Sequence, residues 1–199
     1  MNYLAHLFLA ENSDDSILGN FLGDFVKGRL ESAYSIGVIK GIITHRKVDS
    51  FTESNNWFLM SKKLISQSRR RFAGIIVDVS FDHFLAKNWS DYSSLELSVF
   101  TRKVYDLLEE YKGILPEKLQ LIVPKIIGED WLGSYLNVDG VDTTLNKISR
   151  RFRKENRLTG AVEELISNYN ELEGNFRAFF PELIAYVEDY RKNYVASKI

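Results

Sequence analysis

Apolar residues recur three and four positions apart along most of the chain, with polar residues between them. This spacing places apolar side chains on one face of a helix, which completes a turn every ~3.6 residues. Strict alternation of apolar and polar residues, which would predict strands, is scarce. Only three prolines interrupt the chain, so long stretches can form helices. The prediction depends on three runs: Val38, Ile39, Ile42 and Ile43; Ile75, Ile76 and Val79; and Leu165, Ile166, Tyr169, Leu172 and Phe176.

The pattern therefore predicts an all-α fold, a single-domain helical bundle whose helices end at caps, glycines and prolines. Asp14–Ser16 and Ser93–Ser94 supply N-terminal caps, and Pro116 suits a helix start. Pro124 is expected to shorten or kink the helix that starts at Pro116, and Asp139–Gly140 is interpreted as a loop. The expected helices cover about 3–10, 14–26, 35–52, 55–67, 73–89, 95–113, a segment from 116, 140–153, 158–172 and 175–195.

Composition narrows the classes of protein that the chain can represent. Its 199 residues suit one domain over 1–199, with two small domains as the alternative, and 45% of them are hydrophobic, as in globular proteins. The chain has no cysteine, which excludes disulfides, thiolate metal sites and a cysteine nucleophile. Met1–Ala10 lacks the features of a signal peptide, and no apolar run is long enough to cross a bilayer, so we expect a cytosolic protein. A net charge of −1 argues against a dedicated nucleic-acid binder.

All the histidines, His6, His45 and His83, lie in the first 83 residues, and each has carboxylates nearby in sequence. His45 and Asp49 are four apart, so a helix would turn both side chains the same way, in a geometry suited to two ligands of one metal ion. Such a pair is also common as a surface hydrogen bond, and His6 alone is compatible with a core histidine bonded to a carbonyl.

Two further segments carry inward or clustered carboxylates. Asp78 and Asp82 are four apart and His83 follows directly, so one helix edge offers two carboxylates and an imidazole. These carboxylates alone are equally compatible with a solvated face paired with lysines. Asp24 lies among apolar residues and is expected to point partly inward, where it needs a metal or a histidine as its partner. Capping a helix or meeting an arginine is the alternative for Asp24 alone. Gly19 and Gly23 would allow close approach of a backbone or ligand.

Together these elements favour a metal site, because such sites gather histidines and carboxylates from separate helices. Imidazole and carboxylate ligands without thiolate favour Mn²⁺, Mg²⁺, Fe²⁺ or Zn²⁺. Arg46 and Lys47 follow His45, and the planar guanidinium of arginine matches phosphate oxygens, which indicates phosphoester hydrolysis. A salt bridge from Arg46 to Asp49 or a neighbouring helix is the alternative. No Gly-rich phosphate loop, Walker motif or serine-hydrolase elbow is present.

Four motifs in this order and spacing resemble the acyl carrier protein phosphodiesterases, or ACP hydrolyases. The resemblance covers about the first 90 residues and continues weakly through Trp131 and Tyr169–Pro181. It rests on Asn2–Ala10 (NYLAHLFLA), Gly19–Val26 (GNFLGDFV), His45–Asp49 (HRKVD), and Asp78–Leu85 (DVSFDHFL) followed by Trp89.

This resemblance implies a helical fold distantly related to the HD-domain phosphohydrolases, and Mn²⁺-dependent hydrolysis of the phosphodiester joining 4′-phosphopantetheine to a serine of acyl carrier protein. The products would be apo acyl carrier protein and 4′-phosphopantetheine. The preferred ligands are Asp24, His45, Asp78 and Asp82, with His6 and His83 as further ligands or proton donors to the serine. The sequence departs from the usual HD-domain pattern in one respect: the adjacent His-Asp pair is reversed here, as Asp82–His83. By position the resemblance implies as functional residues His6, Asp24, His45, Asp49, Asp78, Asp82 and His83.

Because acyl carrier proteins are acidic, the resemblance also implies that this chain carries basic docking residues. Ordinary solvated helix faces are an equal interpretation, and no exposed aromatics suited to stacking RNA bases were identified between the basic residues. Two alternatives stay open: an HD-like hydrolase of a small nucleotide, and a non-catalytic helical module that binds an acidic protein. The two basic segments are Lys62, Lys63, Arg69, Arg70 and Arg71, and Arg150, Arg151, Arg153, Lys154 and Arg157.

Overall fold

The structure is a computed structural model that describes residues 1–28, 34–154 and 156–196. Within these ranges it contains ten α-helices and four 3₁₀-helices and no strand, which confirms the all-helical prediction. None of the helices in the described ranges has the length and apolar character needed to cross a membrane.

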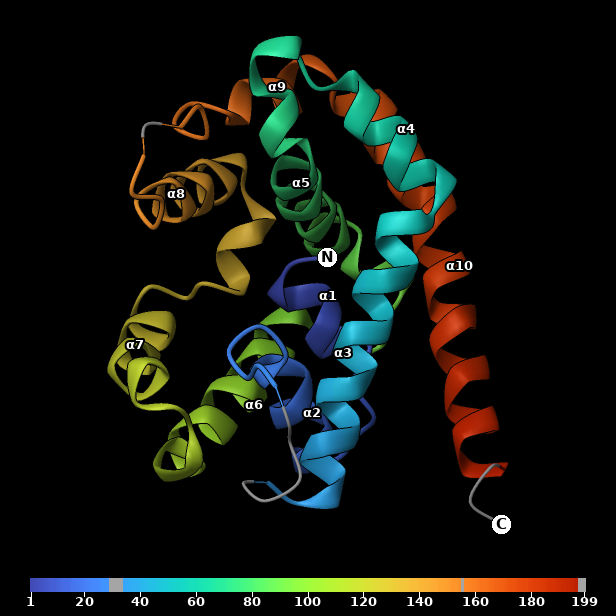
Figure 1. Cartoon of the computed structure of the whole chain (residues 1–199), viewed down its shortest axis with the longest axis vertical. Coiled ribbons are helices and arrows are strands. Elements are labelled where there is room, and N and C mark those ends of the chain that lie inside the picture. Colours follow the sequence, from blue (N-terminus) through green and yellow to red (C-terminus); the bar gives the residue numbers. More distant parts are fainter. Residues whose placement is uncertain (29–33, 155, 197–199) are drawn as a thin grey trace. The chain divides into compact units, whose positions relative to one another are not determined.

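Figure 1 labels the α-helices along the chain, and we number the 3₁₀-helices η1–η4 in chain order. The α-helices are α1 (Tyr3–Phe8), α2 (Asp14–Leu22), α3 (Ile36–Ser54), α4 (Asn56–Leu64), α5 (Ala73–Lys87), α6 (Leu97–Glu110), α7 (Glu117–Gly128), α8 (Val138–Ser149), α9 (Val162–Ser167) and α10 (Tyr169–Ala196). The 3₁₀-helices are η1 (Gln67–Phe72), η2 (Trp89–Asp91), η3 (Lys112–Ile114) and η4 (Gly133–Leu136).

Backbone contacts divide the chain into two compact units, each built from separate stretches of sequence. Unit 1 comprises residue 1 with 47–81 and 141–199, and unit 2 comprises 2–46 and 82–140. Boundaries fall inside α3, α5 and α8, so each of these helices contributes residues to both units. That residues 1–199 form a single domain stays a prediction of the sequence.

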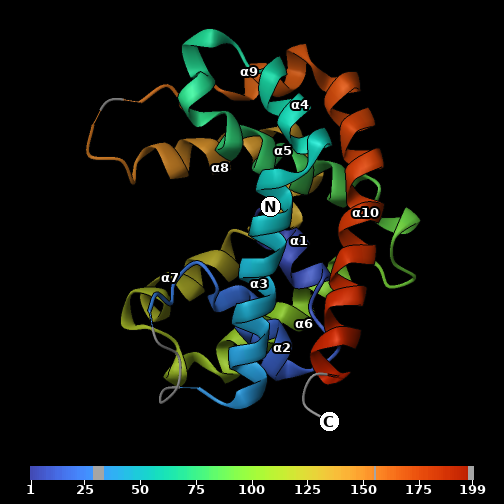
Figure 2. The ribbon, with the colours of Figure 1, turned by 45° about the vertical axis from the view of Figure 1, so that its right-hand side comes forward.

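In unit 1, α4 lies alongside the long α10, as Figures 1 and 2 both show. The core between the helices of this unit is aromatic: Phe81 meets Phe176 edge-on with ring centroids 5.6 Å apart, and its ring lies 5.3 Å from that of Phe179. All three rings are fully buried. Burial of aromatic rings of this size is a major source of folding free energy, and here it fixes α10 against α5.

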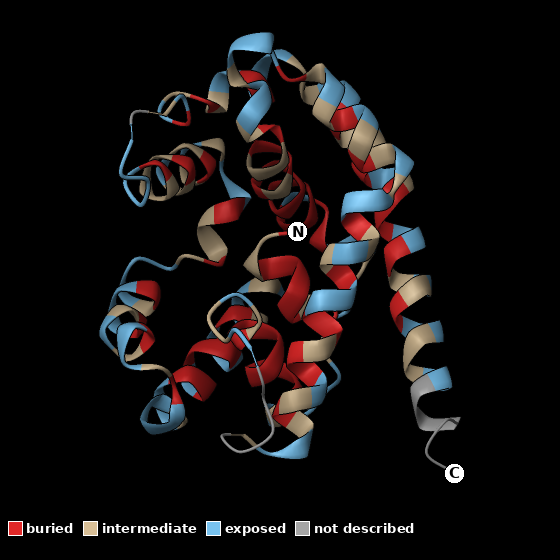
Figure 3. Ribbon diagram, viewed as in Figure 1, coloured by how far each residue is buried: buried red, intermediate tan, exposed pale blue. Residues whose placement is uncertain are grey.

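In unit 2, α1 packs on α2, and α2 packs on α6. Figure 3 shows α1 and α2 coloured as buried along most of their length. The N-terminus of α2 is capped by Ser13, whose hydroxyl accepts the Ser16 N–H at 3.3 Å. Helices α2 and α3 meet through glycines: a Cβ on Gly19 would lie 2.7 Å from the Cα of Gly41. The two backbones are therefore in direct contact, which brings the rows of residues beside these glycines close together.

The prediction that a helix continues to Val26 is wrong, because α2 ends at Leu22. The N–H groups of Phe25 and Val26 both turn back onto the carbonyl of Leu22, at 2.9 and 3.0 Å, so the chain closes a tight turn there. Gly28 follows with a φ of 86°, a conformation that favours glycine and takes the chain away from the helix.

The predicted break near residues 173–174 is also wrong. The helix that was expected over 158–172 is the short α9, and the break falls at Asn168, whose side chain donates to the carbonyl of Glu164 at 2.9 Å. Helix α10 then runs without interruption through Pro181. Gly160, with a φ of 69°, excludes the first residues of the expected helix.

Three smaller predictions on helix ends are corrected. Asp139–Gly140 lies in the first turn of α8, not in a loop before it. The helix expected to begin directly after Ser94 begins at Leu97, and Glu96 is its N-cap residue. Pro124 does not shorten its helix, because α7 extends to Gly128 with the proline inside it.

Candidate functional site

The imidazole of His45 is held in one orientation by the backbone of α2. Its Nδ1 lies 2.7 Å from the carbonyl oxygen of Asn20, and the ring is buried. A carbonyl oxygen can only accept, so Nδ1 carries the proton and donates it. In the neutral ring Nε2 is then the basic nitrogen. A backbone carbonyl on Nδ1 is the arrangement that leaves Nε2 directed at a metal ion in many metal sites.

His6 stacks on His45. The two ring centroids are 3.6 Å apart with an angle of 12° between the ring planes, and both rings are about 1% exposed. At least one ligating nitrogen of each ring lies within 4.8 Å of the other. It is costly for two buried imidazoles at this separation to be positively charged at the same time, since like charges in contact disfavour the charged forms. The pair is therefore suited to present neutral nitrogens.

Asp24 supplies a carboxylate to this histidine pair. Its Oδ1 lies 3.4 Å from Nε2 of His45, and its side chain is 51% exposed. The expectation that Asp24 points partly inward, toward a histidine, is thus confirmed, and the other half of its side chain lies in solvent. A basic imidazole nitrogen facing a carboxylate repels it unless a positive charge lies between them, either a proton on His45 or a metal ion. The donor set therefore fits a divalent cation.

Gly23 explains how α2 can approach His45 so closely. A Cβ at this position would lie 2.1 Å from the imidazole ring of His45, so any side chain would displace the ring. Gly23 itself has helical backbone angles, and the reason for glycine here is the close approach alone. The sequence predicted a close approach at Gly23 but not which residue occupies the space.

Asp82 anchors the helix that carries His6. Its Oδ2 accepts the backbone N–H of Leu4 at 2.7 Å and its Oδ1 accepts that of Ala5 at 3.3 Å, and its side chain is fully buried. These N–H groups belong to the first turn of α1, which has no partner for them within the helix. The structure therefore gives Asp82 the task of positioning α1.

His83, the next residue on α5, bonds in the same way as His45. Its Nδ1 donates to the carbonyl oxygen of Tyr135 at 2.7 Å, and the ring is buried. Tyr135 belongs to η4, and its hydroxyl accepts a hydrogen bond from the side chain of Asn2 at 2.8 Å. Neither Asn20 nor Tyr135 was predicted as a site residue, because both act on the histidines through main-chain oxygens that any residue possesses.

The remaining predicted ligands, Asp49 and Asp78, meet in unit 1. The amino nitrogen of Met1 lies 2.9 Å from Oδ1 of Asp78 and 3.9 Å from Oδ1 of Asp49, so both carboxylates face one positive charge. Both residues line a cavity of about 500 Å³. Asp49 also follows His45 by one turn of α3, and Asp78 precedes Asp82 by one turn of α5. The prediction that each of these two pairs lies one turn apart on a single helix is confirmed.

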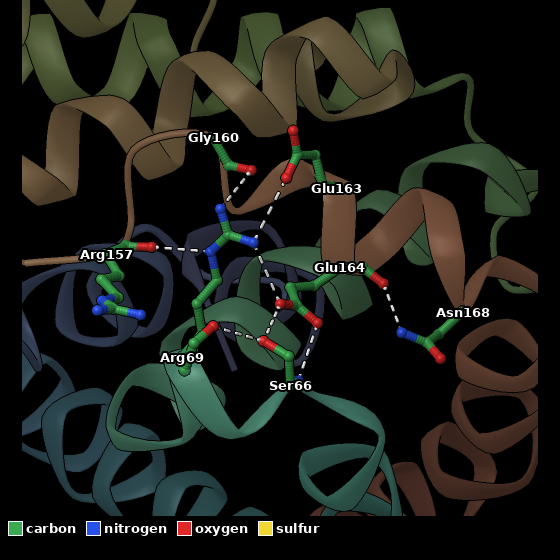
Figure 4. A network of polar contacts seen from close by, with 8 residues as sticks. Ser66, Arg69, Arg157, Gly160, Glu163, Glu164 and Asn168 are labelled. Carbon is green, nitrogen blue, oxygen red and sulfur yellow. Dashed lines mark hydrogen bonds and ion pairs between the residues drawn. The ribbon is translucent and has the colours of Figure 1, made fainter.

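The predicted basic residues have different environments. Arg46 is exposed and donates to the carbonyl of Val26 at 3.0 Å. Arg69 is largely enclosed: its guanidinium donates to the carbonyls of Arg157 and Gly160 and to the carboxylate of Glu164, at 3.0, 3.2 and 3.2 Å. Figure 4 shows this network. Because these guanidinium N–H groups donate to acceptors inside unit 1, we do not propose Arg69 as a partner-binding residue.

The other predicted partner-binding residues, Arg70, Arg71, Arg150, Arg151 and Arg153, are exposed. Phe152, between two of these arginines, is 43% exposed, and its ring meets Phe72 edge-on with centroids 5.6 Å apart. The expectation of no exposed aromatic among the basic residues is therefore wrong. The Phe72–Phe152 contact and the Arg69–Arg157 hydrogen bond bring the two predicted basic segments together.

Comparison with known proteins decides the family. The family model described as acyl carrier protein phosphodiesterase matches residues 1–183. Curated relatives of that name include proteins from Serratia proteamaculans, 34% identical over 95% of this chain and 98% of theirs, and Photorhabdus laumondii, 33% identical over 95% and 96%. One from Escherichia coli is 31% identical over 92% and 96%. The chain belongs to the acyl carrier protein phosphodiesterase family. No solved structure matches it.

Membership of the acyl carrier protein phosphodiesterase family confirms the resemblance predicted from the four motifs. The family match includes every residue that was predicted as catalytic, metal-binding or partner-binding. The likeness to HD-domain phosphohydrolases stays a prediction.

Proposed function

We propose that the protein hydrolyses the phosphodiester that joins 4′-phosphopantetheine to a serine of acyl carrier protein, using a bound divalent metal ion. Apo acyl carrier protein and 4′-phosphopantetheine would be the products. The family and the names of the relatives support the substrate. The observation that carries the chemistry is the His45 imidazole, fixed by the Asn20 carbonyl so that Nε2 faces Asp24 at 3.4 Å.

His45 and Asp24 would hold the ion, with His6 stacked on His45 as an additional ligand. Asp49, four residues after His45 in the sequence, stays a predicted ligand on its spacing alone. We expect Mn²⁺ to serve best, with Mg²⁺, Fe²⁺ or Zn²⁺ as alternatives. A divalent ion supplies positive charge against phosphate oxygens and activates water near neutral pH. Asp82 is not among the proposed ligands, because both of its oxygens accept backbone hydrogen bonds from α1.

The chain's own residues would orient the phosphodiester and its leaving group. Arg46 is exposed, and the planar fork of its guanidinium matches phosphate oxygens. The serine alkoxide is a poor leaving group and needs a proton. We assign this proton to His83, whose ring is fixed by its hydrogen bond to Tyr135.

The exposed cations of unit 1 would receive the carrier protein. The segments around Arg70 and Arg153 lie in contact through the Phe72 and Phe152 rings, so they form one surface. An acidic protein would be steered to such a surface, and Phe152 offers apolar area for the contact. We call the following residues the basic surface: Lys63, Arg70, Arg71, Arg150, Arg151, Arg153, Lys154 and Arg157.

The decisive experiment incubates the purified protein with holo acyl carrier protein and Mn²⁺ and reads the carrier by intact-protein mass spectrometry. The wild type and a control variant, Asp139→Asn, should remove the phosphopantetheine mass, and Asp24→Ala should not. Asp139 is an exposed carboxylate on α8 in a different part of the chain. Hydrolysis of small nucleotides with an unchanged carrier protein would overturn the proposal in favour of a nucleotide hydrolase.

A second experiment separates docking from chemistry. Reversing two charges, Arg151→Glu with Arg153→Glu, should raise KM for holo acyl carrier protein at low salt at least tenfold while kcat changes little. Lys118→Glu, an exposed charge reversal on α7 outside the basic surface, is the control. Equal KM values for both variants would show that the basic surface does not receive the carrier protein.

A further inference from the structure

Unit 2 contains a groove outside the histidine cluster. It has a volume of about 620 Å³ and lies between α6 on one side and the segment from the end of α7 to η4 on the other. Sites for small molecules in proteins typically enclose ~300–1,000 Å³, so the groove is large enough for an extended organic group. The mechanism proposed above does not use any residue that lines it.

A rigid polar pair forms part of the groove wall. The hydroxyl of Tyr105 donates to Oδ1 of Asp130 and accepts the N–H of Leu132, both at 2.8 Å. The same carboxylate oxygen accepts the N–H of Gly133 at 3.2 Å, and Asp130 has a φ of 44°. A residue other than glycine in this left-handed conformation costs about 1 kcal/mol or more. The surrounding hydrogen bonds hold it there.

The rest of the lining is mixed in polarity. Leu97, Ile127 and Leu136 give it apolar area, and Leu136 is 50% exposed. Arg102 and Asp106, exposed on α6, add a donor and an acceptor of opposite charge. A lining with both signs of charge and aliphatic patches between them suits an elongated ligand without net charge, whose amide or hydroxyl groups alternate with aliphatic carbon.

The groove adjoins the residues proposed to act on the phosphodiester. Leu136 directly follows Tyr135, whose carbonyl holds the ring of His83 at 2.7 Å. The Tyr135 hydroxyl accepts a hydrogen bond from the side chain of Asn2, which is the N-cap residue of α1, the helix that carries His6. One wall of the groove is thus a single residue away from the hydrogen bonds that position the candidate proton donor.

We propose that this groove holds the pantetheine arm of the substrate while the phosphodiester lies at the histidine cluster. The inference rests on the proposed function, and it names the part of the substrate that the enzyme recognises. The pantetheine arm is uncharged and flexible, with two amides, a hydroxyl and a branched aliphatic carbon, which is the chemistry that the lining suits. Binding of this remote part would orient the reacting phosphate.

The test fills the groove. Leu136→Trp narrows it from η4, and Ser98→Trp, an exposed residue of the opposite wall, repeats the test independently. Leu121→Trp, at a position 82% exposed on α7 and outside the groove lining, is the matched control. Activity is measured on holo acyl carrier protein and on bis(4-nitrophenyl) phosphate, a diester without the arm. Direct binding of free pantetheine is followed by calorimetry.

Both groove variants should lower kcat/KM on holo acyl carrier protein at least tenfold, keep activity on the small diester within twofold, and lose pantetheine binding. The control should match the wild type in all three. The inference is overturned if pantetheine does not bind the wild type. It is overturned as well if pantetheine binds the two groove variants as tightly as it binds the wild type. A wild type inert on the carrier protein defeats the proposed function alone, since binding of pantetheine that both tryptophans abolish would still support the groove.

Discussion

Two acidic side chains of this protein, Glu164 in unit 1 and Asp24 in unit 2, each lie beside a basic group in very different surroundings. Glu164 is buried, with its side chain 7% exposed, and receives the Ser66 N–H at 3.0 Å and the Arg69 guanidinium at 3.2 Å. The Ser66 hydroxyl donates to it as well. Its lone pairs are filled by donors that come from η1 and the residue before it, so this carboxylate joins η1 to α9.

Asp24 has half of its side chain in solvent, and it faces His45 Nε2 at 3.4 Å, longer than a charge-assisted hydrogen bond of ~2.7–2.9 Å. A buried carboxylate with several short donors, such as Glu164, contributes to stability. A carboxylate such as Asp24, which faces a fixed imidazole from the surface, instead combines negative charge with access to solvent, as a site for a cation or substrate requires.

The largest effect is expected at Asp24. Asp24→Asn keeps the shape of the side chain but removes the charge that would hold the ion, so kcat on holo acyl carrier protein should fall about a thousandfold. Because the side chain is half exposed, the free energy of unfolding should change by less than ~0.5 kcal/mol. Steady-state kinetics and chemical denaturation measure both. A large loss of stability with normal kcat would reverse the assignment.

Glu164→Ala should give the opposite result. It leaves the Ser66 N–H and the Arg69 charge without their acceptor, and should lower the free energy of unfolding by about 2–3 kcal/mol. The lower end is expected, because Arg69 retains some contact with water. Per folded molecule, kcat should match the wild type. Glu163→Ala is the control, since that neighbouring carboxylate is 73% exposed and 3.5 Å from Arg69. Equal destabilisation by both variants would contradict the role of Glu164.

A smaller effect is expected at the close approach of α2. Gly23→Ala places a methyl group against the His45 ring, so the ring must shift and kcat should fall about tenfold. Gly128→Ala, at the end of α7 where a Cβ meets no atom within 4 Å, is the matched control and should leave kcat unchanged. Identical kinetics for the two variants would show that the ring position tolerates movement.

The smallest effect is the pH dependence of the Glu164 contribution. Burial raises the pKa of Glu164, but hydrogen bonds from Ser66 and Arg69 more than reverse this, so the pKa lies below its usual value of 4.5. A pKa lowered by folding adds stability above the unfolded pKa, and that stability is lost as pH falls through the folded pKa. The stability difference between the wild type and Glu164→Gln should therefore shrink below pH ~4.5 in denaturation curves. Parallel curves down to pH ~3 would contradict this.

Local spacing allowed the helices and part of the site to be predicted. His45 and Asp49, and Asp78 and Asp82, are each four residues apart, so their places on α3 and α5 follow from helix geometry alone. The basic character of residues 69–71 was also visible in the sequence.

Contacts between distant segments determine what spacing could not predict. The helix expected to continue to Val26 ends at Leu22, so Asp24 lies in a turn whose shape the apolar spacing did not predict. The bonds of Asp82 to α1 span more than 70 residues of sequence. Likewise Arg69 and Arg70 are adjacent arginines in the sequence, and only the fold encloses one and exposes the other.

The glycine contact between α2 and α3 limits how this part of the protein can evolve. A methyl group on Gly19 would lie 2.2 Å from the Val38 carbonyl, and one on Gly41 would lie 2.7 Å from the Ser16 carbonyl. A clash with backbone cannot be relieved by shrinking a neighbouring side chain, as a clash in an ordinary core can. Compensating second mutations are therefore not accessible at these two positions. Lineages that retain the α2–α3 spacing, and with it the placement of His45, should retain both glycines together.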